Sequence, residues 1–519
     1  MGELPTTAGG ATPAAAACPR RQMRRLLLTS LAVLLTLAAT AAPAQGASRV
    51  IVRGAGFGHG IGMSQYGALG FAERGRDHAF ILGHYYRGTQ LGRLAGSSDV
   101  RVLMRSAARI TFSGASAVAG GRSLDPARTY GATRALGANV VLRSASGRDL
   151  GTYAAPLRVT GTPAGVLLGG RAENSVTDGR YRGDLELRPG GLGMSAINVL
   201  SMEDYVRGVV AGEVPTSWPQ EALRAQAVAA RTYAIATSKN GDGFDQYADT
   251  RSQMYIGIAG EVASTNAAVA ATAGEVVVYA GKPIVTYYFS TSGGRTENIE
   301  NSFLGAQPQP WLTSVEDPFD TGSPRHRWTR RMTLRQADAR LGDLVKGSLR
   351  QIRVLQRGRS PRVVRAQIIG TRGRTAVTGP QLRSRLDLYD TWARFTVITA
   401  NATRGDGDAP RAPAPAPAPA GPDTGGAIPT ARAAAVLSIA GARGEQGTVP
   451  AAGVIAGRVT PAIAGRAIVV QRFTQGRWVA QLETRTRAAG RYRANVGLPG
   501  LYRVRYAGEP GPPVRVRVR

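Results

Sequence analysis

The stretch that decides the fold runs from residue 198 to residue 235 and reads NVLSMEDYVRGVVAGEVPTSWPQEALRAQAVAARTYAI. Its opening Ser201-Met-Glu-Asp has the form of a helix capping box, and apolar residues then recur at helical spacing. Pro215 is expected to end this first helix. A second helix is predicted from about Pro219, with Glu221 in its first turn and alanines along one face. The stretch therefore predicts two helices, the second packed closely on a neighbour.

Glu213 is the acid of most chemical interest in this stretch. It follows Val209 and Val210 at spacings of four and three, which puts its carboxyl beside the apolar stripe of the first helix. Partial burial there raises the pKa of a carboxyl group, as a general acid working near neutral pH requires. From spacing alone, an ordinary ion pair of Glu213 with Arg207 or Arg231 is the alternative.

Strands are predicted on both sides of the helices. Residues 95–195 are rich in Gly, Val, Arg and Thr and are expected to form a β-rich part, with strand-like runs at 100–104 and 138–142. Residues 409–428 contain an alternating Ala-Pro run, typical of a stiff linker. Residues 429–519 alternate polar and apolar residues between Gly and Pro, which predicts an antiparallel β-sandwich with an accessory or spacer role.

The N-terminus has the layout of a signal peptide. Four arginines between residues 20 and 25 precede an apolar run over 26–42 and a small-residue cleavage site, so residues 1–46 are predicted to be removed. A membrane anchor is the alternative, because the run is near the lower limit of about 17–20 residues for spanning a bilayer. Cys18 is the only cysteine and would leave with the signal. The mature chain is then expected to have no disulfide and no thiolate metal ligand.

The chain is strongly basic. Its formal net charge of +31 falls to +28 without the first 46 residues, which hold four Arg and one Glu. Such a charge favours polyanions, but the arginines are scattered and are not grouped with aromatic residues, so no nucleic-acid partner is predicted. An exported protein meets the carboxylates of peptidoglycan and anionic wall polymers instead. Arginine codon bias in a GC-rich genome is a second explanation for part of the excess.

The stretch 198–235 closely resembles the core of the stage II sporulation protein D (SpoIID) and amidase-enhancer (LytB) family. The resemblance continues through DTRSQMYIG at 249–257 and YFSTSGGRTE at 288–297, and a further family-like block, GFGHGIGMSQYGA, occupies 56–68. In the family this block usually ends the domain, whereas here it leads. A permuted chain order is compatible with one fold if the two ends of the domain lie close together.

The resemblance implies a lytic transglycosylase that cleaves between N-acetylmuramic acid and N-acetylglucosamine and leaves a 1,6-anhydro end. One carboxyl, that of Glu213, would serve as both acid and base, because the 6-hydroxyl of the sugar replaces water. Glu203 and Asp204 are alternative acids, but a capping role suits their place in the first helical turn better. The resemblance also predicts residues near the glycan, namely Arg231, Gln253, Tyr255, Ser290, Ser292, Gly293, Thr296, His59 and Gln65.

No metal or cofactor is predicted. Some sporulation members hold zinc with Cys and His near the segment that here spans 247–253, and Asp249 is the only ligand type left there. His59 and His84 are a conceivable metal pair. The glycines around His59 favour a tight structural loop instead.

Together these features predict an α+β protein: a β-rich domain with short helices over 47–400, its catalytic core at 196–320, then the Pro/Ala linker and the C-terminal sandwich. The expected location is outside the cell membrane on the cell wall, with peptidoglycan glycan strands as partner and membrane contact only through an uncleaved signal. Two other functions stay open, a non-catalytic enhancer of an N-acetylmuramoyl-L-alanine amidase and an adhesion or scaffold protein.

Overall fold

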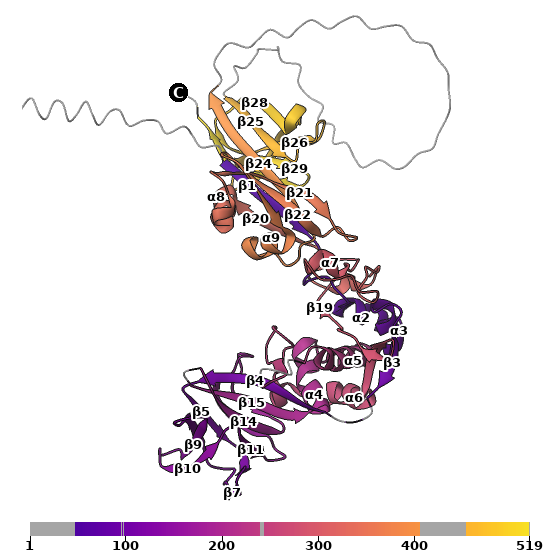
Figure 1. Ribbon diagram of the computed structural model, residues 1–519. Coiled ribbons are helices and arrows are strands. Elements are labelled where there is room, and N and C mark those ends of the chain that lie inside the picture. The colour runs from indigo at the N-terminus through magenta and orange to yellow at the C-terminus, as the bar shows by residue number, and fades with distance from the viewer. Residues whose placement is uncertain are drawn as a thin grey trace, which may run out of the picture.

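The computed structural model describes residues 47–404 and 453–517, apart from residues 95, 97, 192 and 239–242. The predicted signal peptide and the predicted linker at 409–428 lie outside the described residues. The described part is elongated, with a β-rich lobe at each end and most of the helices between them (Figure 1). The chain is thus an α+β protein, as predicted.

The first lobe is formed mainly by residues 99–201. Its strands are β4 (Asp99–Ala107), β5 (Arg109–Ser113), β6 (Ala115–Val118), β7 (Arg122–Ser123), β8 (Tyr130–Arg134), β9 (Asn139–Ser144), β10 (Asp149–Ala154), β11 (Leu157–Gly161), β12 (Val166–Arg171), β13 (Thr177–Tyr181), β14 (Asp184–Gly190), β15 (Gly193–Ser201) and the later β16 (Gln246–Tyr247). They form a seven-stranded sheet in the order β16-β4-β15-β14-β11-β6-β7 and a six-stranded sheet in the order β10-β9-β8-β5-β12-β13. The β structure predicted for this region, including both strand-like runs, is confirmed.

Two helices follow directly from strand β15, as the deciding stretch predicts. They are α4 (Met202–Glu213) and α5 (Gln220–Ala236). The side chain of Ser201 caps α4 by accepting a hydrogen bond from the backbone N–H of Asp204, and α5 begins after Pro219. The apolar faces of both helices belong to the same buried cluster as the first lobe, so helices and sheets share one core.

The middle of the molecule is helical. It contains α2 (Gln65–Ala72), α3 (His78–Tyr85), η2 (Gly257–Gly260), α6 (Ala263–Ala271), α7 (Ile299–Ser302) and η3 (Asp320–Gly322), with the short strands β2 (Met63–Ser64), β3 (Gln90–Arg93), β17 (Glu275–Tyr279), β18 (Lys282–Pro283) and β19 (Tyr288–Phe289). Strand β2 pairs in parallel with β19. This pairing places the N-terminal block 56–68 beside the segment 288–297, although more than 200 residues separate them along the chain.

The second lobe joins residues from both ends of the described chain. Its elements are β1 (Ala47–Gly54), β20 (Trp328–Thr333), α8 (Leu334–Leu341), η4 (Gly342–Leu344), β21 (Leu349–Arg357), β22 (Val363–Gly370), β23 (Arg374–Thr378), α9 (Gly379–Leu386), β24 (Ala393–Arg404), β25 (Gly453–Thr460), β26 (Ala467–Thr474), β27 (Arg477–Arg485), η5 (Ala488–Gly490), β28 (Arg491–Val496), β29 (Gly500–Tyr506), β30 (Glu509–Pro510) and β31 (Val514–Val516). Strand β1 pairs antiparallel with β24, so the two ends of the region 47–400 lie side by side. That is the arrangement a permuted chain order requires.

The C-terminal strands continue this lobe. One sheet has the order β20-β1-β24-β25-β28, and a second contains β27-β26-β29-β30 with β31 on β29. Ile51 and Ile398 from the first sheet share a buried cluster with Val470 and Tyr502 from the second. Residues after 452 are therefore packed onto strands that precede 405, while the domain limits at 400 and 429 stay predictions.

Gly62 lies where the N-terminal block meets β19, and it tests how strongly this contact supports the fold. Its φ is +73°, and a Cβ atom there would collide with the carbonyl oxygen of Tyr287. We expect Gly62→Ala to destabilise the protein by about 2–4 kcal/mol, because backbone strain and overpacking both act. Gly75→Ala is the matched control, since Gly75 has a φ of +75° and a Cβ atom there would have no described atom within 4 Å. Equal denaturation midpoints for the two variants would contradict a tight contact.

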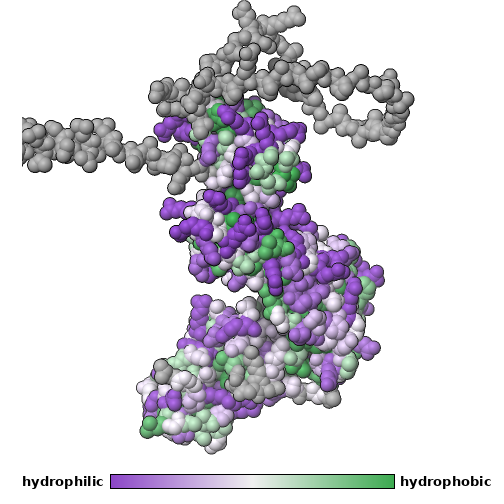
Figure 2. Space-filling model, turned by 45° about the horizontal axis from the view of Figure 1, so that its top comes forward, coloured by the Kyte–Doolittle hydropathy of each residue, from purple (hydrophilic) through white to green (hydrophobic). Residues whose placement is uncertain are grey.

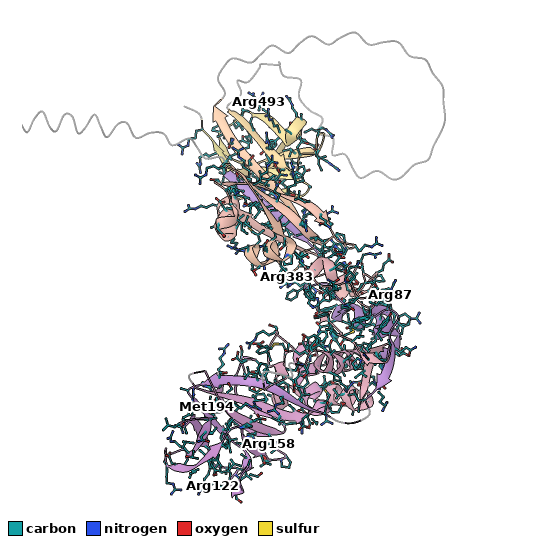
Figure 3. All side chains as sticks on the ribbon, in the orientation of Figure 1. Arg87, Arg122, Arg158, Met194, Arg383 and Arg493 are labelled. Atoms are coloured by element: carbon teal, nitrogen blue, oxygen red, sulfur yellow. The ribbon has the colours of Figure 1, made fainter. Side chains whose placement is uncertain are left out.

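Charge is spread along the whole described chain. Arginines lie from Arg122 at one end of the molecule, past Arg87 and Arg383, to Arg493 at the other (Figure 3). The space-filling view shows hydrophilic side chains over both lobes and a hollow between them (Figure 2). Of the helices in the described ranges, none has the length and hydrophobicity needed to cross a bilayer.

Candidate functional site

The candidate acid, Glu213, is the last residue of α4. Val209 and Val210 in the same helix are fully buried, whereas the Glu213 side chain is half-buried. The backbone N–H of Met254 donates a hydrogen bond of 2.8 Å to its Oε1 atom. The carboxyl thus lies at the edge of the core, held on one oxygen, as its spacing from the two valines predicts.

A polar chain of side chains lies next to this carboxyl. The Tyr288 hydroxyl donates to Gln253 Oε1 at 2.7 Å, and Gln253 Nε2 lies 3.2 Å from the Tyr205 hydroxyl. Gln253 immediately precedes Met254, whose N–H holds Glu213. The strand β19, the helix α4 and the segment 249–257 are therefore joined around one carboxyl group.

Burial determines the protonation of Glu213. Desolvation raises the pKa of its carboxyl above the usual range, and hydrogen bonding with the Met254 N–H, Tyr288 and Gln65 opposes part of that rise. Among the described residues, none of the groups that shift this pKa is a second carboxylate or an arginine. A carboxyl group in this setting keeps its proton at a higher pH than an exposed one.

Neither arginine of the ion-pair alternative pairs with Glu213. Arg231 is fully buried and forms a two-pronged pair with Glu203 at 2.7 and 2.8 Å, and it also donates to the carbonyl oxygen of Glu275. Arg207 pairs with Asp204 at 2.9 Å. The ion-pair alternative for Glu213 is therefore wrong, and the bonds of Arg231 fix the start of α4 instead.

The N-terminal block contributes one side chain to Glu213. Gln65, at the start of α2, donates through Nε2 to the Glu213 carbonyl oxygen and to Gln226 Oε1, each at 3.4 Å. His59 lies further along the same block, where Nδ1 accepts from the Ile61 N–H and Nε2 lies 3.1 Å from the Tyr288 carbonyl oxygen. The structure therefore brings Gln65 to the backbone of Glu213 and makes His59 a support for β19.

His59 is held in its neutral form. Burial, with the charges of Arg383 and Arg362, lowers the pKa of its imidazole to about 3. His84 lies elsewhere, 2.8 Å from the Glu316 carbonyl oxygen, so the two histidines do not form a pair. No group of three or more His, Cys, Asp or Glu side chains within the described ranges is arranged to hold a metal ion.

The loop after β19 contains four of the predicted residues, and two of them bond to a buried acid, Asp320. Ser292 Oγ and the Gly293 N–H donate to Asp320 Oδ2 at 3.3 and 2.6 Å. Thr296 accepts the Val315 N–H through its hydroxyl, and the Ser290 carbonyl accepts the Tyr66 N–H at 3.0 Å. These bonds shape the loop, and the hydroxyls of Ser292 and Thr296 are buried within it.

Tyr255 and Gln253 are placed differently from the expectation that they contact a glycan. Tyr255 is 1 % exposed, donates to Asn198 Oδ1 at 2.7 Å and packs against Tyr181 and Tyr205. Gln253 is equally buried. Stacking on a sugar would need an exposed ring face, which the buried Tyr255 does not have. Both side chains instead support the site from inside, where Gln253 positions Tyr288.

Sequence reasoning missed a second unusual acid near the loop. Asp317 is fully buried, accepts from the Tyr85 hydroxyl at 2.8 Å through Oδ1, and has no hydrogen bond to Oδ2 among the described residues. Burial, and then the charge of Asp320, raises the pKa of the Asp317 carboxyl to about 6. Asp317 lies in the loop segment Glu316-Asp317-Pro318, which has no periodic pattern that would predict the burial of its carboxyl group.

Replacing Asp317 tests this shift. Because the native pKa lies above the usual value of 3.8, the native state keeps its full stability below about pH 4 and loses stability as pH rises through about 6. We expect Asp317→Asn to be more stable than the natural chain at pH 8, by up to about 3 kcal/mol, with the difference vanishing near pH 4. Denaturation midpoints across this pH range measure it. Asp149→Asn is the control, since Asp149 is 63 % exposed; a pH-independent difference for Asp317→Asn would contradict the shift.

Comparison with known proteins matches the region that contains Glu213. A family model described as stage II sporulation protein matches residues 191–279, which contain α4, Glu213 and α5. Stage II sporulation protein D of Bacillus subtilis is 30 % identical over 232 residues, covering 41 % of this chain and 66 % of the relative. The chain belongs to the SpoIID/LytB family. The amidase enhancer of Bacillus subtilis is 38 % identical over 148 residues, or 28 % of this chain.

The match to these relatives is partial. An uncharacterized protein of Brachyspira hyodysenteriae is 44 % identical over 131 residues, which is 36 % of its length. The chain spans 66 % of the sporulation protein and 19 % of the amidase enhancer. The family model covers residues 191–279, the region around the two helices, so the SpoIID/LytB family match includes the candidate site.

Proposed function

We propose that this protein is a lytic transglycosylase that cleaves the glycan strands of peptidoglycan, with Glu213 as its single acid and base. The observation that carries the proposal is a half-buried carboxyl with a raised pKa that forms no ion pair with an arginine among the described residues. A structural glutamate in a chain this rich in arginine would be expected to pair, as Glu203 does with Arg231. Glu213 is instead kept ready to hold and release a proton.

The proposed reaction needs only one carboxyl group. Because the Met254 N–H occupies Oε1, the proton is carried on Oε2, from which it passes to the oxygen between N-acetylmuramic acid and N-acetylglucosamine. The bond from the muramic C1 to that oxygen breaks, which leaves an oxocarbenium-like centre. The muramic 6-hydroxyl then bonds to C1 and gives its proton to the Glu213 carboxylate, so the product is a 1,6-anhydro end and the acid is restored.

The neighbours of Glu213 suit both halves of this cycle. The Met254 N–H, Tyr288 and Gln65 stabilise the carboxylate after the proton has left, and burial returns the group to its protonated form. The groups that act on Glu213 include no second carboxyl among the described residues. A hydrolase of the usual two-carboxylate kind would need one to activate water or to act as nucleophile.

Digestion of purified sacculi tests the proposal. The full chain is incubated with sacculi, and the soluble products are identified by mass. Muropeptides with anhydro ends, each 18 mass units lighter than the hydrolysed form because one water is missing, are expected. Products with reducing ends would indicate a hydrolase, and release of stem peptides would indicate an amidase.

A second function is favoured by the 38 % identity to an amidase enhancer. In this alternative the same site binds glycan strands without cleaving them, and the protein stimulates an N-acetylmuramoyl-L-alanine amidase. The burial of Gln253 and Tyr255 does not distinguish the two functions. Glycan cleavage and glycan binding both need the loop after β19 in place. Anhydro products from the purified chain alone would exclude this alternative as the only function.

The location and the domains follow from the same proposal. Residues 1–46 act as an export signal, residues 47–400 form the peptidoglycan-acting domain, and residues 429–519 act as an accessory module on the wall. Export is tested by the N-terminal residue of the protein recovered from the culture medium or the wall. An N-terminus near residue 47 is expected.

A further inference from the structure

The second lobe contains a groove that the proposed reaction does not use. Two adjoining cavities of about 580 and 480 Å³ lie between the hairpin β21–β22 and the strands β24 and β25. They share the lining residues Gln351, Arg353, Arg458 and Thr460, so they form one elongated groove. An elongated groove suits a stretch of polymer better than a single small ion.

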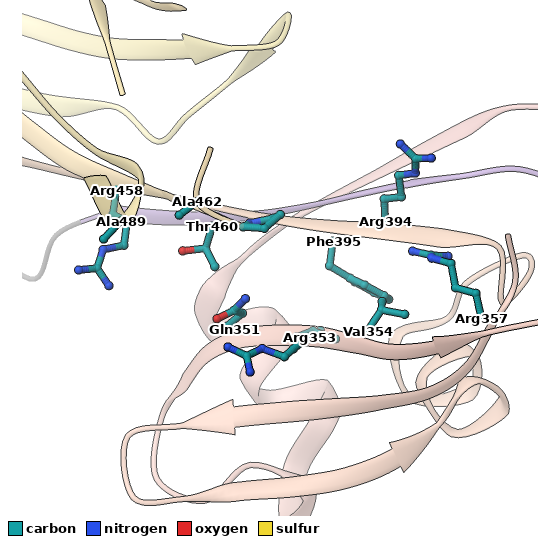
Figure 4. A pocket seen from close by; sticks show the side chains of 12 residues that line it. Gln351, Arg353, Val354, Arg357, Arg394, Phe395, Arg458, Thr460, Ala462 and Ala489 are labelled. Atoms are coloured by element: carbon teal, nitrogen blue, oxygen red, sulfur yellow. The ribbon is translucent and has the colours of Figure 1, made fainter. Parts of the chain in front are cut away.

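The groove is cationic. Its lining includes six arginines and, among the described residues, no carboxylate: Arg350, Arg353, Arg357, Arg374, Arg394 and Arg458. Figure 4 shows Arg353 and Arg458 at one end of the larger cavity and Arg357 and Arg394 at the other. All but Arg357 are exposed, and burial with the charge of Arg394 lowers the pKa of the Arg357 guanidinium.

These six arginines also differ from several other arginines of the same lobe in their partners. Elsewhere in the described chain many arginines pair with acids, as Arg330 and Arg331 of the same lobe do with Asp387 and Glu509. None of the six groove arginines forms an ion pair with a described residue. Their charge is therefore available to an anionic ligand.

The floor of the groove indicates which anion fits. Val354 and Pro461 supply aliphatic surface to the groove, whereas Ile352, Val397 and Phe395, the one aromatic residue among the described lining residues, are buried. Sugars and nucleobases bind by stacking on open aromatic rings, which this lining does not offer. Guanidinium groups recognise phosphate through two parallel hydrogen bonds, and aliphatic side chains suit short carbon units between phosphates.

We propose that this groove binds a linear polyol-phosphate polymer of the cell envelope. The phosphodiesters contact the arginines at the two ends, and the polyol units lie on the aliphatic floor. The inference goes beyond the proposed cleavage of glycan strands, since it concerns a different ligand and a different lobe. Binding of this polymer would hold the protein beside its glycan substrate. The charge responsible would be that of the arginines in one groove and not the charge spread over the whole surface.

Binding of the full chain to synthetic poly(glycerol phosphate), followed by fluorescence anisotropy at several salt concentrations, tests the proposal. The variant R353Q/R394Q/R458Q is expected to bind roughly tenfold or more weakly at low salt and to lower the salt dependence of log Kd by about two. The matched control is R122Q/R148Q/R171Q, which removes three exposed arginines of the first lobe that form no ion pair with a described residue. It should change Kd by less than about twofold.

The other outcomes overturn the proposal in distinguishable ways. Equal weakening by both triple variants would show that diffuse charge binds the polymer. Equal affinity for poly(γ-glutamate) would show a site for any polyanion, and tighter binding of oligo(dT) would show a nucleic-acid site. Glu213→Gln should bind poly(glycerol phosphate) like the natural chain, so failure of the cleavage proposal and failure of this one are separate results.

Discussion

Glu213→Gln is expected to lower the rate at which anhydro-ended muropeptides are released from sacculi by about 10²- to 10⁴-fold, the range that a positioned general acid contributes. The amide cannot donate a proton to the glycosidic oxygen and cannot take one from the 6-hydroxyl. Both halves of the proposed cycle are therefore lost with one substitution. Mass analysis of the soluble products at matched protein concentration measures the change.

The substitution should leave the fold intact. Glutamine keeps the Oε1 acceptor for the Met254 N–H and has nearly the same volume. Burial raises the pKa of Glu213, so the native state of the natural chain loses stability as pH rises through that raised value. We therefore expect Glu213→Gln to be at least as stable as the natural chain at pH 8, and the advantage to disappear in acid. An unfolded variant would instead show a lower thermal midpoint at every pH.

The matched control is Glu73→Gln at the end of α2, where the side chain is exposed and forms no ion pair with a described residue. It removes the same charge from the surface and should retain activity within about twofold. Persistent anhydro products with Glu213→Gln would remove Glu213 from the mechanism. Loss of amidase stimulation without any cleavage in the natural chain would support the enhancer function instead.

Much of the fold around the site was accessible from local patterns. Helical spacing, Ser201, Pro215 and Pro219 predict both ends of α4 and the start of α5 within one or two residues. Strand-like runs predict strands of the first lobe, and period-two alternation predicts strands after residue 452. The place of Glu213 beside Val209 and Val210 follows from the same spacing. These features depend on neighbours in the chain, so a single sequence contains them.

The long-range features were not accessible. The parallel pairing of β2 with β19 and the Asp320 cluster join segments hundreds or tens of residues apart, and no local periodicity encodes such partners. The same limit explains Arg231, whose spacing allows a bond to Glu213 or to Glu203. Only the packed structure, in which Arg231 is buried next to Glu203, selects one of them.

The buried pair of Arg362 and Asp390 illustrates how the second lobe supports the site, and removing it should have the largest effect on stability. The Arg362 side chain is 1 % exposed and donates to Asp390 Oδ2 at 2.8 Å and to the carbonyl oxygens of Ser292 and Arg295 at 2.9 and 2.8 Å. We expect Asp390→Ala to destabilise the protein by about 3–5 kcal/mol, because it leaves a buried guanidinium without its counter-charge. The loop after β19 should loosen with it.

A double-mutant cycle separates the pair from the space it fills. Arg362→Met with Asp390→Asn removes both charges, so the double variant should be less destabilised than the sum of the single variants by about 2 kcal/mol or more. Asp343→Asn is the surface control, since Asp343 is 76 % exposed and pairs with the half-exposed Arg385; it should cost less than about 1 kcal/mol. Additive single effects would mean that the carbonyl contacts of Arg362, rather than its charge pairing, hold the loop that carries Ser292.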